Sequence, residues 1–201
     1  MVATLQTTKI AHNNGTDALT VSTDGTITTD KHIIPPAGAI IQIQYDQLTT
    51  ETTSQAFSAS TAAVVSNFPT VNITPNKTSS KIKIDVSMMF EFGASGSQHN
   101  HMFFLYRDST RIGYTGTATS TWYGIAMATN TYTETGNDAS TPNQLHLHFF
   151  DSPNTTDEIT YKLGFISNNA QTLYINRTVA SNNAANYERG ISFISATEIA
   201  G

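Results

Sequence analysis

The feature that most constrains the fold is a strict two-residue alternation of apolar side chains in the segment 81–92. Every second position holds a large apolar residue: Ile82, Ile84, Val86, Met88, Phe90 and Phe92. An amphipathic helix needs apolar spacings of three and four residues, so this segment cannot be a helix stripe. The alternation predicts a β-strand with one face in a hydrophobic core.

The same alternation occurs twice between Leu145 and Phe165, on either side of a polar turn that contains Ser152-Pro153-Asn154. The apolar positions are Leu145, Leu147 and Phe149 before the turn and Ile159, Tyr161, Leu163 and Phe165 after it. Two alternating runs joined by a proline-containing turn are typical of neighbouring strands. We therefore interpret this stretch as two strands paired in one antiparallel sheet.

The composition agrees with an all-β chain and excludes several functions. Charged residues make up only 12% of the 201 residues, about half the usual share, and the formal net charge is −5. Lysine and arginine form no cluster, which argues against nucleic acid and anionic membranes as partners. Cysteine is absent, so disulfides, thiol catalysis and zinc–thiolate sites are excluded. The N-terminal residues show no export signal, and no apolar run is long enough for membrane insertion.

The pattern predicts two domains, an N-terminal segment of residues 1–38 and a main domain of residues 39–201. Asn14-Gly15 and Asp24-Gly25 are favoured pairs for type I′ hairpin turns, so the first segment is predicted to form a β-hairpin. A hairpin this small needs a partner, which favours a trimerising stalk or attachment arm over a frayed terminus. Pro35-Pro36-Ala37-Gly38 ends the segment because two prolines and a glycine stop a strand.

In the main domain, Ile41, Ile43 and Tyr45 alternate with polar residues and predict a half-buried first strand. The segment 101–108 is apolar on both faces, which is typical of a strand at the centre of a sheet. With further strands at 71–73, 172–177 and 191–199, we count about eight strands at the spacing of a sandwich. The predicted fold is an all-β, antiparallel jelly-roll-like β-sandwich, since this closure limits exposed edges.

Several short motifs resemble the C-terminal domains of bacteriophage tail fibres, notably those of phages that infect cyanobacteria. They lie in order over about residues 39–201. The six motifs are Thr74–Ile82, Leu105–Asp108, Phe150–Asn154, Ile159–Lys162, Tyr174–Thr178 and Ile194–Ile199. The N-terminal units Gly15–Val21 and Asp24–Ile27 are similar to segments of fibre shafts.

This resemblance implies a structural protein of the virion, a trimeric tail fibre whose distal β-domain adsorbs to a host surface glycan or protein receptor. It implies that the protein is made in the host cytoplasm, forms a homotrimer, and meets other tail or baseplate proteins through its N-terminus. We expect neither enzymatic activity nor a cofactor. A polysaccharide-degrading fibre (depolymerase) and a purely structural fibre or decoration subunit are the alternatives.

The candidate receptor-binding residues lie in the segment 113–143, which has no regular alternation. Tyr114, Trp122, Tyr123, Tyr132, Asn137 and Asp138 combine aromatic faces, which stack on sugar rings, with acceptors for sugar hydroxyl groups. The alternative is that Trp122 and Tyr123 pack between subunits.

Two His-x-His pairs, His99 with His101 and His146 with His148, are candidate metal ligands. Residues i and i+2 of a strand point the same way, so each pair could present two imidazoles on one face. Repeated around a trimer axis, such pairs could supply six nitrogen ligands to iron or a similar ion. The alternative is that these histidines are exposed polar positions.

Acidic residues gather in two predicted turns, with Asp151, Asp157 and Glu158 in one and Glu134 and Asp138 in the other. Paired carboxylates are what a glycosidase needs. Acidic side chains in turns more often accept hydrogen bonds from local amides, so we interpret them as structural.

Overall fold

The computed structural model describes residues 9–11, 17–29, 35–93, 100–113, 123–128, 140–180 and 187–201. Within these ranges every regular element is a β-strand, and no helix is present that could cross a membrane. The chain divides into two compact units, Met1–Pro36 and Ala37–Gly201.

The first unit contains a three-stranded antiparallel sheet in the order β1-β2-β3, formed by β1 (Lys9–Ala11), β2 (Asp17–Val21) and β3 (Ile27–Thr29). The predicted hairpin is confirmed at β2 and β3, which the Ser22–Thr26 loop connects. In this loop Ser22 N donates to Thr26 O, Asp24 accepts from Thr26 N, and Gly25 has a φ of +86°. A type I′ turn needs a positive φ at both central residues, and Asp24 does not have one. The predicted type I′ turn at Asp24-Gly25 is therefore wrong.

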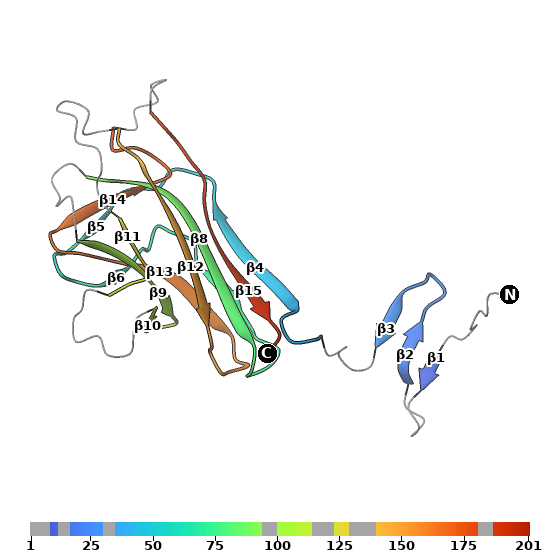
Figure 1. Ribbon diagram of the computed structural model, residues 1–201. Helices are drawn as coiled ribbons and strands as arrows, with labels where there is room; N and C mark the ends of the chain where they lie inside the picture. The colour runs from blue at the N-terminus through green and yellow to red at the C-terminus, as the bar shows by residue number, and fades with distance from the viewer. Residues whose placement is uncertain are drawn as a thin grey trace. The chain divides into compact units, whose positions relative to one another are not determined.

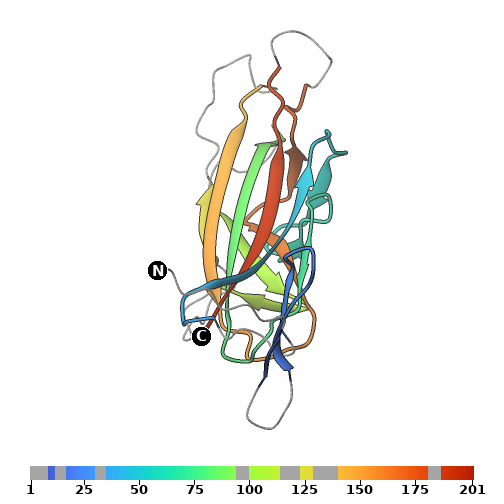
Figure 2. The ribbon, with the colours of Figure 1, turned by 90° about the vertical axis from the view of Figure 1, so that its right-hand side faces the viewer.

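The second unit is a sandwich of two antiparallel sheets, which confirms the predicted fold class (Figure 1). We name the sheets after their central strands. The β8 sheet has the strand order β4-β15-β8-β14-β5, and β12 also pairs with β8. Its strands are β4 (Ile40–Leu48), β5 (Gln55–Phe57), β8 (Lys81–Phe92), β12 (Asn143–Asp151), β14 (Gln171–Ile175) and β15 (Ser192–Ile199). Figure 2 shows β12, β8, β15 and β4 side by side in orange, green, red and cyan.

The β9 sheet covers the other side of the core. It has the order β10-β9-β13-β6, with β11 on β9 and β7 on β13. Its strands are β6 (Ala63–Val64), β7 (Val71–Ile73), β9 (His101–Arg107), β10 (Thr110–Ile112), β11 (Ala126–Ala128) and β13 (Ile159–Ser167). The central position predicted for the segment 101–108 is confirmed, because β9 has β13 on one side and β10 and β11 on the other.

The core lies between the two sheets and is rich in aromatic side chains. All six alternating apolar residues of β8 are buried, as the sequence predicts. Phe165 of β13 is fully buried at the centre of an aromatic cluster. Its ring centroid lies 4.9 Å from those of Phe57 and Phe103 and 5.7 Å from that of Phe92. Both sheets therefore contribute rings to one continuous core.

The predicted pairing of the two strands between Leu145 and Phe165 is wrong. The strand β12 pairs with β8, with Leu147 opposite Val86, whereas β13 pairs with β9, with Leu163 opposite Leu105. The connecting segment 152–158 crosses from one sheet to the other. Alternation in the sequence shows which face of a strand is buried but not which strand pairs with it. Here β12 and β13 lie in different sheets, and their apolar faces meet across the core.

The predicted first strand is confirmed as β4, but the prediction of its buried face is wrong, because β4 turns Ile43 and Tyr45 outward. Ile43 and Tyr45 are 55% and 70% exposed and lie opposite Thr197 and Ser195 on the outer face of the β8 sheet. The inner position is taken by Gln42, whose Nε2 donates to Glu198 Oε2 at 2.7 Å. The need to satisfy a buried carboxylate thus outweighs the burial of two apolar side chains at a sheet edge.

Glu198 of β15 is fully buried and fastens the turn before β8 to the C-terminal strand. Its carboxylate accepts hydrogen bonds from Ser80 Oγ at 2.6 Å and from the backbone N of Asn76 at 2.7 Å. Burial alone raises the pKa of Glu198, but the hydrogen bonds from Ser80, Gln42 and Asn76 outweigh burial and lower the pKa below its ordinary value of 4.5.

This lowered pKa predicts that Glu198 makes the stability of the sandwich depend on pH. The folded state binds the proton of Glu198 less readily than the unfolded state, so the contribution is fully present above pH 4.5. It is lost as the pH falls through the folded-state pKa. Urea unfolding followed by circular dichroism at neutral and acidic pH measures this loss. We expect Glu198→Gln to lose less stability on acidification than the wild type or Glu158→Gln, and an equal loss in all three contradicts the prediction.

Candidate functional site

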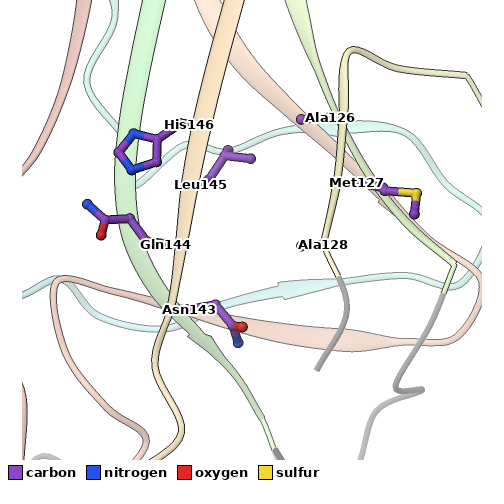
Figure 3. Close-up of a pocket in the computed structure, with 7 residues that line it drawn as sticks. All are labelled: Ala126, Met127, Ala128, Asn143, Gln144, Leu145 and His146. Atoms are coloured by element: carbon purple, nitrogen blue, oxygen red, sulfur yellow. The ribbon is translucent and has the colours of Figure 1, made fainter. Parts of the chain in front are cut away.

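The candidate site is a cleft of about 250 Å³ at one side of the sandwich, where β11 approaches β12 (Figure 3). Its lining comes from two short segments: Ala126, Met127 and Ala128 of β11, and Asn143, Gln144, Leu145 and His146 of β12. The cleft therefore lies between one strand of the β9 sheet and one strand of the β8 sheet.

The pairing of the two strands explains why a cleft forms here. The strand β11 pairs with β9 along one edge, with Met127 opposite Met102, and β12 pairs with β8 along one edge, with Leu145 opposite Met88. Among the described residues, no strand pairs with the other edge of either one. An unpaired edge presents backbone N–H and C=O groups, so both sides of the cleft offer main-chain donors and acceptors.

The side chains of the cleft differ in direction and exposure. Figure 3 shows Asn143 and Leu145 extending from β12 toward β11, whereas Gln144 and His146 extend from the opposite side of that strand. Leu145 is only 3% exposed and forms an apolar base, while Met127 is 73% exposed. The small side chains of Ala126 and Ala128 fill little of the space between the strands.

The chemistry of the lining favours an uncharged, hydroxyl-rich ligand. None of the seven lining residues is Asp, Glu, Lys or Arg, and His146 is the only titratable one. The amides of Asn143 and Gln144 both donate and accept, which matches the hydrogen bonding of sugar hydroxyl groups. The lining provides binding groups and contains neither a carboxylate pair nor a nucleophile for hydrolysis.

A buried carboxylate anchors the β12 side of the cleft. Glu91 Oε1 accepts hydrogen bonds from the backbone N and the Oγ1 of Thr141, at 2.7 and 2.9 Å. Its other oxygen, Oε2, accepts from the backbone N of Val179 at 2.6 Å. Because Thr141 lies two residues before Asn143, these bonds fix the start of the lining segment to β8.

An arginine sandwich anchors the β11 side. The Arg111 guanidinium lies 3.7 Å from the ring centroid of Phe104 and 3.9 Å from that of Tyr123, and it donates to the backbone O of Tyr123. Burial lowers the pKa of Arg111, and the nearby Tyr123 and Tyr106 hydroxyls oppose that change. Ile125 N donates to Phe103 O at 2.8 Å and continues this attachment to β11.

The structure describes only one of the six residues predicted to bind a receptor. Tyr123 is half-buried against Arg111, three residues before β11, and acts as a packing residue in this arrangement. The other five, Tyr114, Trp122, Tyr132, Asn137 and Asp138, lie outside the described residues. They belong to the segments 114–122 and 129–139, which flank the segment containing β11 on both sides along the chain.

The structure describes three of the four histidines predicted as metal ligands, and a metal site shared between copies around a trimer axis stays a prediction. His146 and His148 do share the exposed outer face of β12, as predicted, and His148 Nδ1 lies 2.5 Å from Asp85 Oδ1. His101 is 1% exposed inside the core, 4.2 Å from the ring centroid of Phe92, and His99 lies outside the described residues. Among described residues, no three His, Asp or Glu side chains are grouped as metal ligands.

The acidic residues at the end of β12 and in the turn after it make structural contacts. Asp151 is buried, and Arg107 Nη1 donates to its Oδ1 at 3.1 Å and to its Oδ2 at 3.0 Å. Asp151 Oδ2 also accepts from the Tyr161 hydroxyl at 2.7 Å. Burial and this hydrogen bond raise the pKa of Tyr161. Asp157 bonds locally with Thr155, while Glu158 is exposed. Glu134 and Asp138 of the other predicted cluster lie outside the described residues.

Of the residues that line the cleft, sequence reasoning selected only His146, which it assigned as a metal ligand. The strand β11 is only three residues long and lies in the region without regular alternation, so its Ala-Met-Ala pattern carries little strand signal. Asn143 ends the irregular segment and Gln144 directly precedes the strand predicted to begin at Leu145, so neither belongs to a predicted strand. A feature that could have drawn attention to them is their position between the irregular segment and a strongly alternating strand.

Comparisons with known proteins leave the family open. No family model matches the chain, and no curated protein matches it. Solved structures that align with it include infectious bursal disease virus, strain Gx (14% identity, TM-score 0.32), and its T=1 particles (11% identity, TM-score 0.34). The VP2 subviral particle of the same virus also aligns (12% identity, TM-score 0.32). Each alignment covers 87% of this chain, which spans 42–44% of the virus chains.

Proposed function

We propose that this chain is a structural protein of a bacteriophage virion, a tail-fibre protein whose sandwich binds a neutral host surface glycan. The observation that carries the proposal is the uncharged cleft between the facing edges of β11 and β12. The motif resemblance over about residues 39–201 supplies the biological setting, and the all-β sandwich agrees with it.

The assembly belongs to the same proposal. The fibre is a homotrimer, and the first unit attaches it to other proteins of the tail or baseplate. A three-stranded sheet with strands of three to five residues buries little apolar surface by itself, which supports a role in association. The glycan-binding function resides in the second unit, which contains the cleft.

Binding is proposed without cleavage of the glycan. Asp151, the buried carboxylate at the end of β12, is neutralised by Arg107 and hydrogen-bonded to Tyr161. A general acid or nucleophile must reach the substrate, whereas this carboxylate is committed to packing the turn. Incubation of the protein with host polysaccharide, followed by an assay for new reducing ends, is expected to show no product.

The double variant Asn143→Ala/Gln144→Ala tests the cleft. Removing two amides eliminates several hydrogen bonds to sugar hydroxyls, so we expect affinity for the glycan to fall about tenfold or more. Binding of the full-length protein to immobilised surface polysaccharides from a panel of cyanobacterial strains measures this change.

His148→Ala is the matched control, because His148 lies on the same strand as the lining residues and outside the cleft. It is expected to keep wild-type affinity. Equal binding by the double variant and the wild type contradicts the assignment of the cleft. Selective binding to protein receptors from the same envelopes, with none to polysaccharide, contradicts the proposed ligand class.

A further inference from the structure

The exposed apolar side chains of the second unit are concentrated on one face. Among the described residues of this unit, six large apolar side chains are exposed: Ile40, Ile43, Tyr45, Met127, Phe150 and Ile191. Met127 belongs to the cleft. Ile40, Ile43 and Tyr45 follow one another along the outer face of β4, and Ile191 directly precedes β15. Such clustering on a sheet face marks an interaction surface more than chance exposure does.

Strand register defines the extent of this surface. Ile43 lies opposite Thr197, Tyr45 opposite Ser195, and Gln47 opposite Phe193, while the inward positions of β15 are buried. We name the outward residues of the two strands the β4–β15 face: Ile40, Ile43, Tyr45, Gln47, Phe193, Ser195, Thr197 and Ile199. In Figure 2 these strands run side by side, in cyan and red, next to β8.

The charge distribution indicates which partner this face fits. All eight residues of the β4–β15 face are uncharged. The neighbouring half of the same sheet face carries Lys83, Asp85 and His148, which pair with one another. An uncharged apolar face can pack on an identical face without like-charge repulsion, whereas the charged half cannot do so freely.

The position of β4 in the chain supports the same partner. The second unit starts at Ala37, and β4 starts three residues later at Ile40. If copies associate through their first units, the short connection brings their β4 strands to a high effective concentration.

We propose that the β4–β15 face is the surface through which copies of this chain associate. The inference rests on the assembly part of the proposed function and deepens it by naming the contact surface. Ile43 and Tyr45 provide the apolar centre, because both are more than half exposed in the single chain and have no charge beside them on β15.

The test is the oligomeric state of the full-length protein, measured by sedimentation velocity over a range of concentrations. We expect the wild type to be an oligomer and Ile43→Glu to raise its dissociation constant about 100-fold or more, since each copy would bury an unpaired carboxylate. Gln44→Glu is the control, because it adds the same charge one residue away on the other face of β4.

Cysteine protection provides a readout that does not depend on a disruptive charge. The chain has no cysteine, so Tyr45→Cys and Gln44→Cys each carry a single thiol. We expect the thiol of Tyr45→Cys to react slowly with a maleimide at high protein concentration and rapidly after dilution. The thiol of Gln44→Cys is expected to react rapidly throughout.

Each remaining outcome overturns a specific part of the account. A monomeric wild type contradicts the assembly in the proposed function and this surface with it. An oligomer that Ile43→Glu leaves intact contradicts only the surface. Rapid reaction of the Tyr45→Cys thiol in the oligomer shows that the face stays exposed there, and it excludes a second copy as the occupant.

Discussion

Replacing Glu198 by alanine is expected to lower the free energy of unfolding of the sandwich by about 3–5 kcal/mol. The fully buried carboxylate accepts from Gln42 Nε2, from both nitrogens of Asn76 and from Ser80 Oγ. Alanine leaves these donors without their acceptor, and of the three donor residues Ser80 is the one shielded from water, whereas Asn76 is exposed and Gln42 half-buried. Ser80 is itself only 2% exposed, so its hydroxyl cannot recover the bond from bulk solvent.

Chemical denaturation followed by far-ultraviolet circular dichroism measures this effect. Glu158→Ala is the control, because Glu158 is exposed in the turn before β13, and it is expected to change stability by no more than about 0.5 kcal/mol. If Glu198→Ala is as stable as this control, Glu198 does not hold the turn before β8 to the last strand.

Replacing Phe165 by alanine is expected to destabilise the sandwich by about 3–5 kcal/mol, because it removes the ring at the centre of the core. This ring contacts the rings of Phe57, Phe92 and Phe103, which come from three other strands in both sheets. Phe165 is fully buried within the main hydrophobic core cluster. Close packing from several directions leaves little room for the cavity to collapse.

The same denaturation experiment applies, with Phe150→Ala as the matched control. Phe150 is 60% exposed on the outer face of β12, so its loss is expected to cost much less than the loss of Phe165. Similar destabilisation by the two variants would show that the core is not organised around Phe165.

Local alternation predicted the strands and their buried faces where one face meets the core. In β8 the pattern is unambiguous, since six apolar residues in strict alternation all point inward. The all-β class followed from such runs together with the scarcity of charged residues. These properties are local, so they can be determined from the sequence without knowing which strands are neighbours.

Strand pairing and edge strands could not be predicted in this way. The strands β12 and β13 are adjacent in sequence and lie in different sheets, because the turn between them crosses the core. In β4 the alternation of Ile43 and Tyr45 with glutamines identified a strand but assigned the buried face wrongly. The decisive interaction, between Gln42 and Glu198, joins residues 156 positions apart.

The candidate site was predicted only in part for the same reason. The cleft requires an edge of each sheet, so neither Asn143 nor Ala126 carries a signal for it alone. Glu91 shows a similar limit. It occupies an outward position in the alternation of β8, yet it is fully buried because the segments of Thr141 and Val179 cover it.

Adsorption of the labelled full-length protein to host cells, before and after mild periodate oxidation, tests directly whether the cleft binds a host glycan. Periodate cleaves the vicinal diols of surface glycans and leaves most protein receptors intact. Binding of the wild type to untreated cells is expected to be strong and to be lost after oxidation, and the affinity of Asn143→Ala/Gln144→Ala for untreated cells is expected to be about tenfold lower or more. Binding that survives oxidation, or that is the same in the wild type and the cleft variant, would contradict glycan binding by the cleft.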